Sequence, residues 1–293
     1  MQNSSCTFGN FTLYSIETGR FKLDGGAMFG VVPKTLWSKK IPADNKNRIT
    51  MATRCLLIKS HTTERLYLVD NGVGTKFNDK YASIYGLDFE HSSLLDSLEE
   101  FDFKPNDITD IIFTHLHFDH CGGTTYYDAD GAIKHQFPKA NYYITQKHWE
   151  TVMNPNDREK ASFLPENINP ITESNRLHLV DNGHVYEQGL THYVVHGHSL
   201  GQQMPIIDGD QKTMIFMADL IPTTAHIPIP WVMGYDMRPI ETLKEKKDFL
   251  EKATDEGWIL FMEHDAESEL VTLKKEGGKY QMDSSFTLRD LDD

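Results

Sequence analysis

The sequence predicts an α/β fold in two halves, with the strands of both halves ending at one shared cleft. Apolar runs with the length and composition of β-strands recur along the 293 residues. Four of these runs are followed by histidine or aspartate, and a later segment has the pattern of an amphipathic helix. Strand ends that carry such side chains predict a metal cleft at one edge of the fold.

The first half is predicted to open with a strand over residues 11–16, followed by strands over 55–58 and 65–69. The last two form a hairpin about a polar tip at residues 61–64. Asp70 ends this hairpin, where it either forms the turn or accepts a hydrogen bond from a metal-binding histidine.

The second half is predicted to contain apolar strands over residues 191–196, 214–218 and 258–262. A helix is expected near the charged residues 244–248, which we interpret as its solvated face. Two glycines within residues 276–279 predict a final hairpin.

Two irregular segments are candidates for walls of the cleft. Residues 154–175 are rich in Asn, Pro and charge and lack sustained periodicity, which is typical of an insertion that serves as a lid or a partner contact. Residues 25–33 have glycines on both sides of Phe29, which would let this ring swing.

A short turn after the apolar run at 111–113 holds three histidines and one aspartate. These donors suit zinc, iron, manganese or cobalt better than copper(I). In an extended segment His115, His117 and Asp119 point the same way, whereas His120 turns off that line. One ion cannot take all four donors, so we expect two neighbouring sites. His115 and His117 would share one metal, and Asp119 and His120 the other.

The remaining ligands are expected at the ends of later strands. His198 follows the strand at 191–196 in a glycine-flanked turn, and the alternative, His196, would instead orient a ligand. Asp219 ends an apolar strand, where an isolated buried carboxylate would be costly. His264 ends the next such strand in the same way.

The chain resembles the dinuclear hydrolases of the metallo-β-lactamase superfamily, whose signature His-x-His-x-Asp-His matches residues 115–120. This resemblance covers nearly the whole chain and implies a four-layer αββα sandwich, with residues 1–293 as a single domain. The intervals between the later ligands resemble those of the acyl-homoserine-lactone lactonases and the organophosphate (methyl parathion) hydrolases. Carried over position by position, the resemblance implies that His115, His117 and His198 bind the first metal, that Asp119, His120 and His264 bind the second, and that Asp219 bridges them.

The resemblance implies a metal-dependent hydrolase with two divalent metal ions, zinc before iron, manganese or cobalt. A hydroxide bridging the metals would attack a small neutral ester or lactone, and no protein nucleophile is required. Asp119 would be both a ligand and the catalytic residue that carries a proton to the leaving oxygen.

Three alternatives to a lactonase-like enzyme stay open. Two of them are hydrolases, acting on phosphotriesters (organophosphates) or, in the manner of glyoxalase II, on thioesters. A di-iron redox protein is the non-hydrolase alternative, although that branch of the superfamily usually carries a glutamate where His117 stands.

Phe29, His226, Trp231 and Tyr235 are the candidate substrate-binding residues. Lactonases commonly have a tyrosine three positions after the bridging aspartate, and this chain has Pro222 there. Tyr235 or His226 would replace the missing group. For the aromatic residues the alternative is packing in the core or in a homodimer.

Composition and charge narrow the class of partner. The net charge of −14, from 43 acidic and 29 basic residues, disfavours nucleic acid because a polyanion would be repelled. No apolar run is long enough to span a bilayer, and the N-terminus lacks a signal-peptide pattern. Three scattered cysteines leave at least one thiol free. We therefore expect a cytoplasmic protein that acts on a small molecule and binds neither nucleic acid nor membrane.

Overall fold

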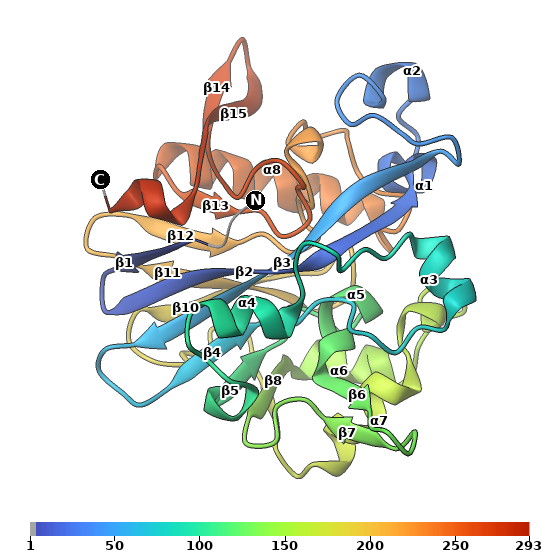
Figure 1. The fold of residues 1–293 in the computed structure, drawn as a ribbon. Coiled ribbons are helices and arrows are strands. Elements are labelled where there is room, and N and C mark those ends of the chain that lie inside the picture. Colours follow the sequence, from blue (N-terminus) through green and yellow to red (C-terminus); the bar gives the residue numbers. More distant parts are fainter. Residues whose placement is uncertain (1–3, 293) are drawn as a thin grey trace.

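The computed structural model describes residues 4–292 and contains two mixed β-sheets flanked by helices (Figure 1). The first sheet has seven strands and the second has six. A separate short hairpin pairs β6 (Thr125–Tyr127) with β7 (Ile133–His135).

The strands of the first sheet, in spatial order, are β1 (Ser5–Phe8), β2 (Phe11–Asp24), β3 (Arg48–Ser60), β4 (Leu66–Val69), β5 (Asp110–Ile112), β8 (Asn141–Thr145) and β9 (Leu177–Val180). Those of the second sheet are β10 (Leu190–Val195), β11 (Gln202–Asp208), β12 (Thr213–Phe216), β13 (Ile259–Phe261), β14 (Leu270–Glu276) and β15 (Lys279–Phe286).

Helices cover the outer faces of both sheets. On the first sheet α4 packs against β2 and α6 against β8, and on the second sheet α8 packs against β14 (Figure 1). This order of layers confirms the expected αββα sandwich. The helices are α1 (Gly25–Phe29), α2 (Lys34–Trp37), α3 (Asp79–Tyr85), α4 (Leu94–Glu100), α5 (Phe118–Cys121), α6 (Gln146–Met153), α7 (Pro165–Glu173) and α8 (Pro239–Asp255).

Successive side chains along the strands of the first sheet point to opposite faces and belong to two separate hydrophobic clusters. Along β3, Leu56 and Ile58 belong to the cluster shared with the second sheet, whereas Cys55 and Leu57 belong to the cluster beneath α4, α6 and α7. This alternation follows from the two-residue period of a strand. Both faces of the first sheet are therefore buried at its centre.

The apolar runs are confirmed as strands, although the structure extends some of them. The run at 11–16 is the first part of β2, which pairs with the equally long β3 as far as Asp24↔Arg48. The polar tip at 61–64 joins β3 to β4, and Gly277 and Gly278 form the turn between β14 and β15.

The segment 154–175, expected to be irregular, contains the helix α7. Pro165 occupies the first turn, where its missing N–H costs nothing. Pro170 lies inside the same helix and hides the helical pattern in the sequence.

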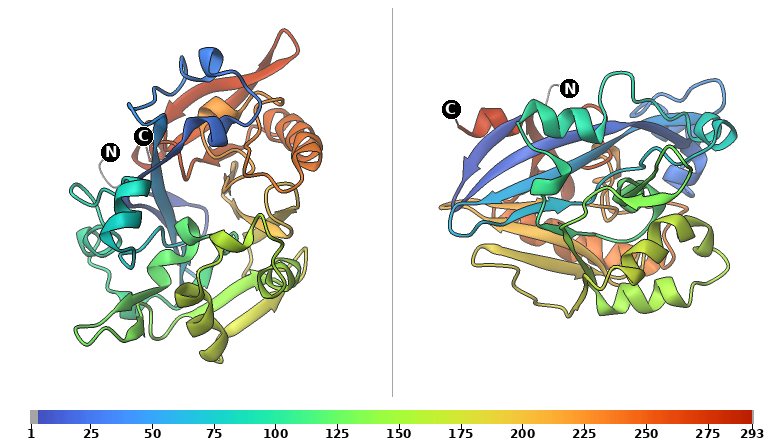
Figure 2. Two further views of the ribbon diagram at one scale, coloured as in Figure 1. Left: turned by 90° about the vertical axis from the view of Figure 1, so that its right-hand side faces the viewer. Right: turned by 60° about the horizontal axis from the view of Figure 1, so that its bottom comes forward.

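Figure 2 gives two further views of this arrangement, in which the first described strand, β1, packs against the last helical turn of the described chain. The backbone N–H of Thr7 donates to Asp292 Oδ1 at 3.1 Å, and β1 contacts the short 3-10 helix Leu288–Leu291. Within residues 4–292, no helix has the length and apolar character needed to cross a bilayer.

Candidate metal centre

Four candidate ligands follow the ends of four strands at the same spacing along the chain. His115, His198, Asp219 and His264 each lie three residues beyond the last residue of β5, β10, β12 and β13, respectively. Strands β12 and β13 are parallel neighbours, so their carboxyl ends meet at one edge of the second sheet. The backbone bond from Gln203 N–H to Thr114 O at 2.9 Å joins the His115 loop to the second sheet.

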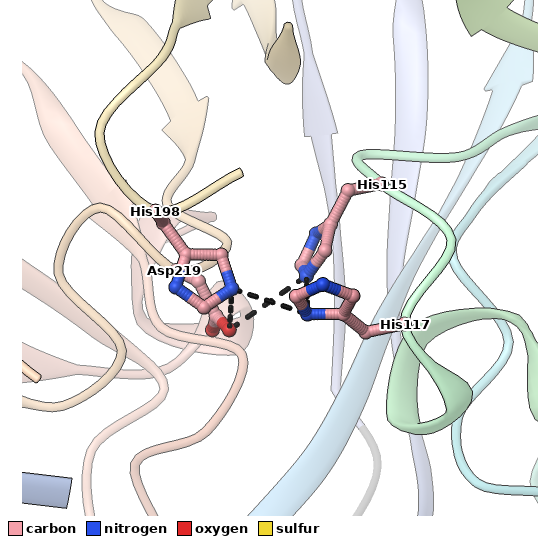
Figure 3. A group of neighbouring side chains, drawn as sticks. All are labelled: His115, His117, His198 and Asp219. Atoms are coloured by element: carbon pink, nitrogen blue, oxygen red, sulfur yellow. Dashed lines mark hydrogen bonds and ion pairs between the residues drawn. The ribbon is translucent and has the colours of Figure 1, made fainter. Parts of the chain in front are cut away.

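The first cluster consists of His115, His117, His198 and Asp219 (Figure 3). His117 Nδ1 lies 3.0 Å from His115 Nε2 and 3.2 Å from His198 Nε2. Asp219 Oδ2 lies 3.1 Å from His198 Nε2 and 3.8 Å from His115 Nε2. All four side chains are buried, and their donor atoms converge on one point.

The second cluster, Asp119, His120 and His264, lies on the other side of Asp219. The Nε2 atoms of His120 and His264 are 3.1 Å apart, and Asp119 Oδ2 is 3.8 Å from each of them. Asp219 Oδ1 lies 3.2 Å from His264 Nε2, and Asp219 Oδ2 lies 3.6 Å from His120 Nε2, so its carboxylate contacts both clusters. The structure therefore brings together all seven residues expected to bind metal, with Asp219 between the two groups.

The ring nitrogen of each histidine that faces away from its cluster has a partner of its own. His115 Nδ1 lies 3.1 Å from Thr114 Oγ1, and His264 Nδ1 lies 2.9 Å from the carbonyl oxygen of Ala52. The other three rings face carboxylates, with His117 Nε2 3.2 Å from Glu159 Oε1, His198 Nδ1 3.1 Å from Asp236 Oδ1 and His120 Nδ1 3.0 Å from Asp70 Oδ2. Such partners fix the tautomer and leave the inward nitrogen free to bind a metal.

Of the two alternatives stated for Asp70, the structure favours the contact with a candidate ligand, since its carboxylate lies 3.0 Å from His120 Nδ1. Its φ of 56° lies in the left-handed region, but no turn is formed there. Thr114 strengthens the contact with His120, since its backbone N–H and its hydroxyl donate to Asp70 at 2.8 and 2.6 Å. A second buried carboxylate, Glu263, lies 3.2 Å from His120 Nδ1.

The charges at this centre fit divalent cations. Burying many negative charges without compensation would be very costly. The buried groups here are six carboxylates and five histidines, namely Asp70, Asp119, Glu159, Asp219, Asp236 and Glu263, and His115, His117, His120, His198 and His264. Burial lowers the pKa of His115 well below its usual value, so this ring offers a lone pair. Burial would raise the pKa of Asp219, but His198 and His264 hold it well below its usual range. The donor set of imidazole and carboxylate suits zinc and its neighbours.

A cavity of about 230 Å³ opens onto the two clusters. His117, Asp119, His198 and Asp219 form part of its lining. Its apolar lining is rich in methionine, a flexible side chain that adapts to irregular ligands, and includes Met28, Met51, Met233 and Met237.

The structure separates the four candidate substrate-binding residues. Tyr235 lines the cavity, whereas Phe29, His226 and Trp231 are not among its lining residues. Phe29 is fully buried and stacks on His226 with ring centroids 4.5 Å apart. His226 Nε2 lies 2.9 Å from the carbonyl oxygen of Met28, and its Nδ1 lies 2.7 Å from Thr223 Oγ1. Both of its nitrogens are thus engaged behind the cavity wall.

The expectation that residues 244–248 form only a solvated helix face is wrong at Lys246, which is fully buried. Its ammonium group donates to three carbonyl oxygens, of His226, Pro228 and Trp231, at 2.6, 3.0 and 2.8 Å. Three acceptors match the three N–H donors of a lysine. Lys246 therefore anchors the segment that leads to Met233 and Tyr235.

Residues 197–201 also fit the Gly-x-Ser-x-Gly pattern of serine hydrolases. Ser199 is fully buried, and its hydroxyl donates to Glu159. It is therefore not placed to attack a substrate.

Sequence reasoning missed several residues that support the centre. Glu159 and Asp236 orient ligand rings from loops distant in the sequence, and Tyr85 and Arg158 line the cavity. An acid directly before His264 was the one available signal for Glu263. All three cysteines are buried and free, and burial raises the pKa of Cys121 to about 12.

Comparisons with known proteins agree with this geometry. Residues 49–264 match the family model of the metallo-beta-lactamase superfamily. The chain is 24% identical to an N-acyl homoserine lactonase of Bacillus thuringiensis over 270 residues, which cover 88% of this chain and 94% of the relative.

Two solved structures share the fold over almost their whole length. A probable metal-dependent hydrolase from Staphylococcus aureus has a TM-score of 0.85 and 29% identity, covering 96% of this chain and 100% of the other. AidC, a dizinc quorum-quenching lactonase solved with a product, has a TM-score of 0.79 and 24% identity, covering 97% and 98% of the two chains.

Proposed function

The chain belongs to the metallo-beta-lactamase superfamily and is a metal-dependent hydrolase, and we propose that it cleaves a small neutral lactone or ester. The observation that carries this proposal is the position of Asp219, between two ligand clusters and on the wall of a methionine-rich cavity.

We assign the ligands as two sets that share one residue. His115, His117 and His198 hold the first cation, His120 and His264 hold the second together with Asp119, and Asp219 serves both. When bound, two divalent cations, zinc before iron, manganese or cobalt, would supply an acidified water and polarise the oxygen of the bond to be cleaved.

Asp119 is the residue assigned to proton transfer. Its carboxylate lines the cavity and lies on the side of the second cluster, so it can hold a proton and pass it to the leaving oxygen. Ser199, the serine of the Gly-x-Ser-x-Gly pattern, is not the nucleophile, because it is buried and hydrogen-bonded to Glu159.

Tyr235 is assigned as the donor that replaces the tyrosine absent at Pro222. Burial and the nearby charge of Asp119 raise the pKa of Tyr235 to about 12, so its hydroxyl keeps its hydrogen at neutral pH. A neutral donor in the cavity can stabilise the oxyanion that develops at a carbonyl.

The cavity supports a neutral substrate. Of the described residues that line it, Arg158 is the one arginine or lysine, and its guanidinium donates to the carbonyl oxygen of Gly234. The net charge of −14 also disfavours an anionic substrate. Methionines on the wall favour an apolar acyl or alkyl group beside the reacting carbonyl.

The test is turnover of matched substrate panels by zinc-loaded protein, with chelator-treated protein as the control. Lactones and neutral esters should be cleaved fastest, activity should vanish on chelation and return with zinc, and Tyr235→Phe should lower kcat by about 100- to 1,000-fold. Faster cleavage of phosphotriesters or thioesters would contradict the assignment of lactones and esters as the substrate class. Turnover undiminished by complete metal removal would refute the mechanism.

A further inference from the structure

Glu159 is a buried carboxylate directly behind a candidate ligand. It lies between α6 and α7, in the insertion, and is 2% exposed. Its Oε1 lies 3.2 Å from His117 Nε2 and accepts a hydrogen bond from the hydroxyl of Ser199, the residue after His198. Its Oε2 accepts from Asn156 Nδ2 at 3.1 Å. Glu159, in the segment 154–175, thus contacts one candidate ligand, His117, and the neighbour of a second, Ser199 beside His198.

The positions of the protons in this network follow from a backbone group. The N–H of Leu116 donates to His148 Nε2 at 2.9 Å, so that nitrogen carries no proton. The proton of His148 is therefore on Nδ1, which lies 3.2 Å from Ser199 Oγ and 3.3 Å from Leu200 O. This leaves the hydrogen of Ser199 directed at Glu159.

A carboxylate can only accept hydrogen bonds, which settles the tautomer of His117. His117 must carry its hydrogen on Nε2, the atom that faces Glu159. Its Nδ1 is then unprotonated and presents a lone pair toward the Nε2 atoms of His115 and His198. This is the tautomer that binding a metal through Nδ1 requires.

We propose that Glu159 is a positioning residue that locks His117 in its Nδ1-donating tautomer and couples the insertion to the first metal site. The proposal rests on the proposed metallo-hydrolase function. The coupling follows from the neighbours of Glu159, since Arg158, Ala161 and Ser162 of the same segment line the cavity. Glu159 thereby fixes the position of this part of the cavity wall relative to His117.

Removing the carboxylate has two expected effects. The Nε2–H of His117 and the hydroxyl of Ser199 lose their acceptor in a buried site, and His117 becomes free to change tautomer or to rotate. Loss of such an orienting partner typically weakens metal binding by about 10- to 100-fold. The first metal should be affected and the second should not, because the side chain of Glu159 contacts His117, Ser199 and Asn156, and none of these belongs to the second cluster.

The experiment compares the full-length wild-type chain with Glu159→Ala, Glu159→Gln and the control Asp157→Asn, whose side chain is 98% exposed in the same segment. Zinc affinity is measured by competition with a chromogenic chelator, and imidazole tautomers by long-range ¹H–¹⁵N NMR of the zinc-loaded protein. Glu159→Ala should lose about 10- to 100-fold in one of the two zinc-binding steps and leave the other unchanged. Glu159→Gln should lose less, since its amide oxygen still accepts a hydrogen bond, and Asp157→Asn should match the wild type.

Wild-type NMR keeps the proposal testable even if Glu159→Ala does not fold. The spectrum should show His117 protonated on Nε2 and His148 protonated on Nδ1. A proton on Nδ1 of His117, or unchanged zinc affinity in folded Glu159→Ala, would overturn the positioning role. A protein with these tautomers and zinc affinities that cleaves no lactone or ester would refute the proposed substrate class and leave the role of Glu159 intact.

Discussion

Asp236 Oδ1 lies 3.1 Å from His198 Nδ1, on the side of the ring opposite Asp219. Both residues of this pair are buried, and Asp236 Oδ2 also accepts a hydrogen bond from the backbone N–H of Met233 at 3.2 Å. Asp236 therefore fixes the ring of His198 and, through the same carboxylate, the turn that carries the cavity residues Met233 and Tyr235.

We expect Asp236→Ala to weaken one of two metals by about 10- to 100-fold, because His198 loses the acceptor that orients it. Metal affinity by calorimetry with zinc measures this change. Asp248→Asn, on the exposed face of α8, is the matched control. Equal weakening of both metals would contradict the assignment of His198 to one cluster.

The metal content of the gently purified protein should approach two ions per chain, since the seven candidate ligands form two groups. Asp219→Ala should weaken both sites together, because its oxygens face both clusters. Elemental analysis after dialysis against metal-free buffer measures the loss. An Asp219→Ala protein that keeps two tightly bound ions would rule out a shared ligand.

His198→Ala should nearly abolish turnover, whereas His196→Ala should cost about 10- to 100-fold. His196 belongs to neither cluster, and its Nδ1 accepts the backbone N–H of Gly201 at 3.1 Å. Its influence on His198 is therefore indirect, through the turn. Steady-state kinetics of the two zinc-loaded variants decide the matter, and the reverse order of severity would show that the turn is misassigned.

The buried pair of Glu17 and Arg54 should make stability depend on acid. Arg54 Nε donates to Glu17 Oε1 at 2.6 Å, and Arg54 Nη1 also donates to the carbonyl oxygens of Met262 and Ser268, so the pair joins the two sheets. Burial would raise the pKa of Glu17, but Arg54 and Arg20 outweigh it and lower that pKa. A lowered carboxyl pKa adds stability above the unfolded-state value of 4.5, and this stability is lost as the pH falls through the folded-state pKa.

Glu17→Gln should therefore reduce the free energy of unfolding by about 3–5 kcal/mol at pH 7, because it removes a carboxylate that is ion-paired with a buried arginine. The deficit should shrink below pH 4.5 as wild-type Glu17 becomes protonated. Urea unfolding of both proteins over this range isolates Glu17, since protonation of the site histidines affects them equally. A deficit that stays constant with pH would mean that Glu17 is not the titrating group.

The sequence by itself determined the candidate ligand set and the strands that precede those ligands in the chain. Donors such as His115 and His117 are neighbours in the chain, so a turn of a few residues fixes their relation. His198, Asp219 and His264 follow apolar runs, and the ends of buried strands are read directly from hydrophobicity. These relations depend on neighbouring residues in the chain, and the structure agrees with them.

Only the tertiary structure decided which residues orient the candidate ligands and which residues line the cavity. Glu159 and Asp236 lie 42 and 38 residues from the rings that they orient, and both come from segments without periodicity. Phe29 looked like a mobile cavity residue, yet packing against His226 buries it. Such contacts depend on how distant loops approach one another, and that approach is set by the packing of the whole sandwich, so no local pattern in the sequence records it.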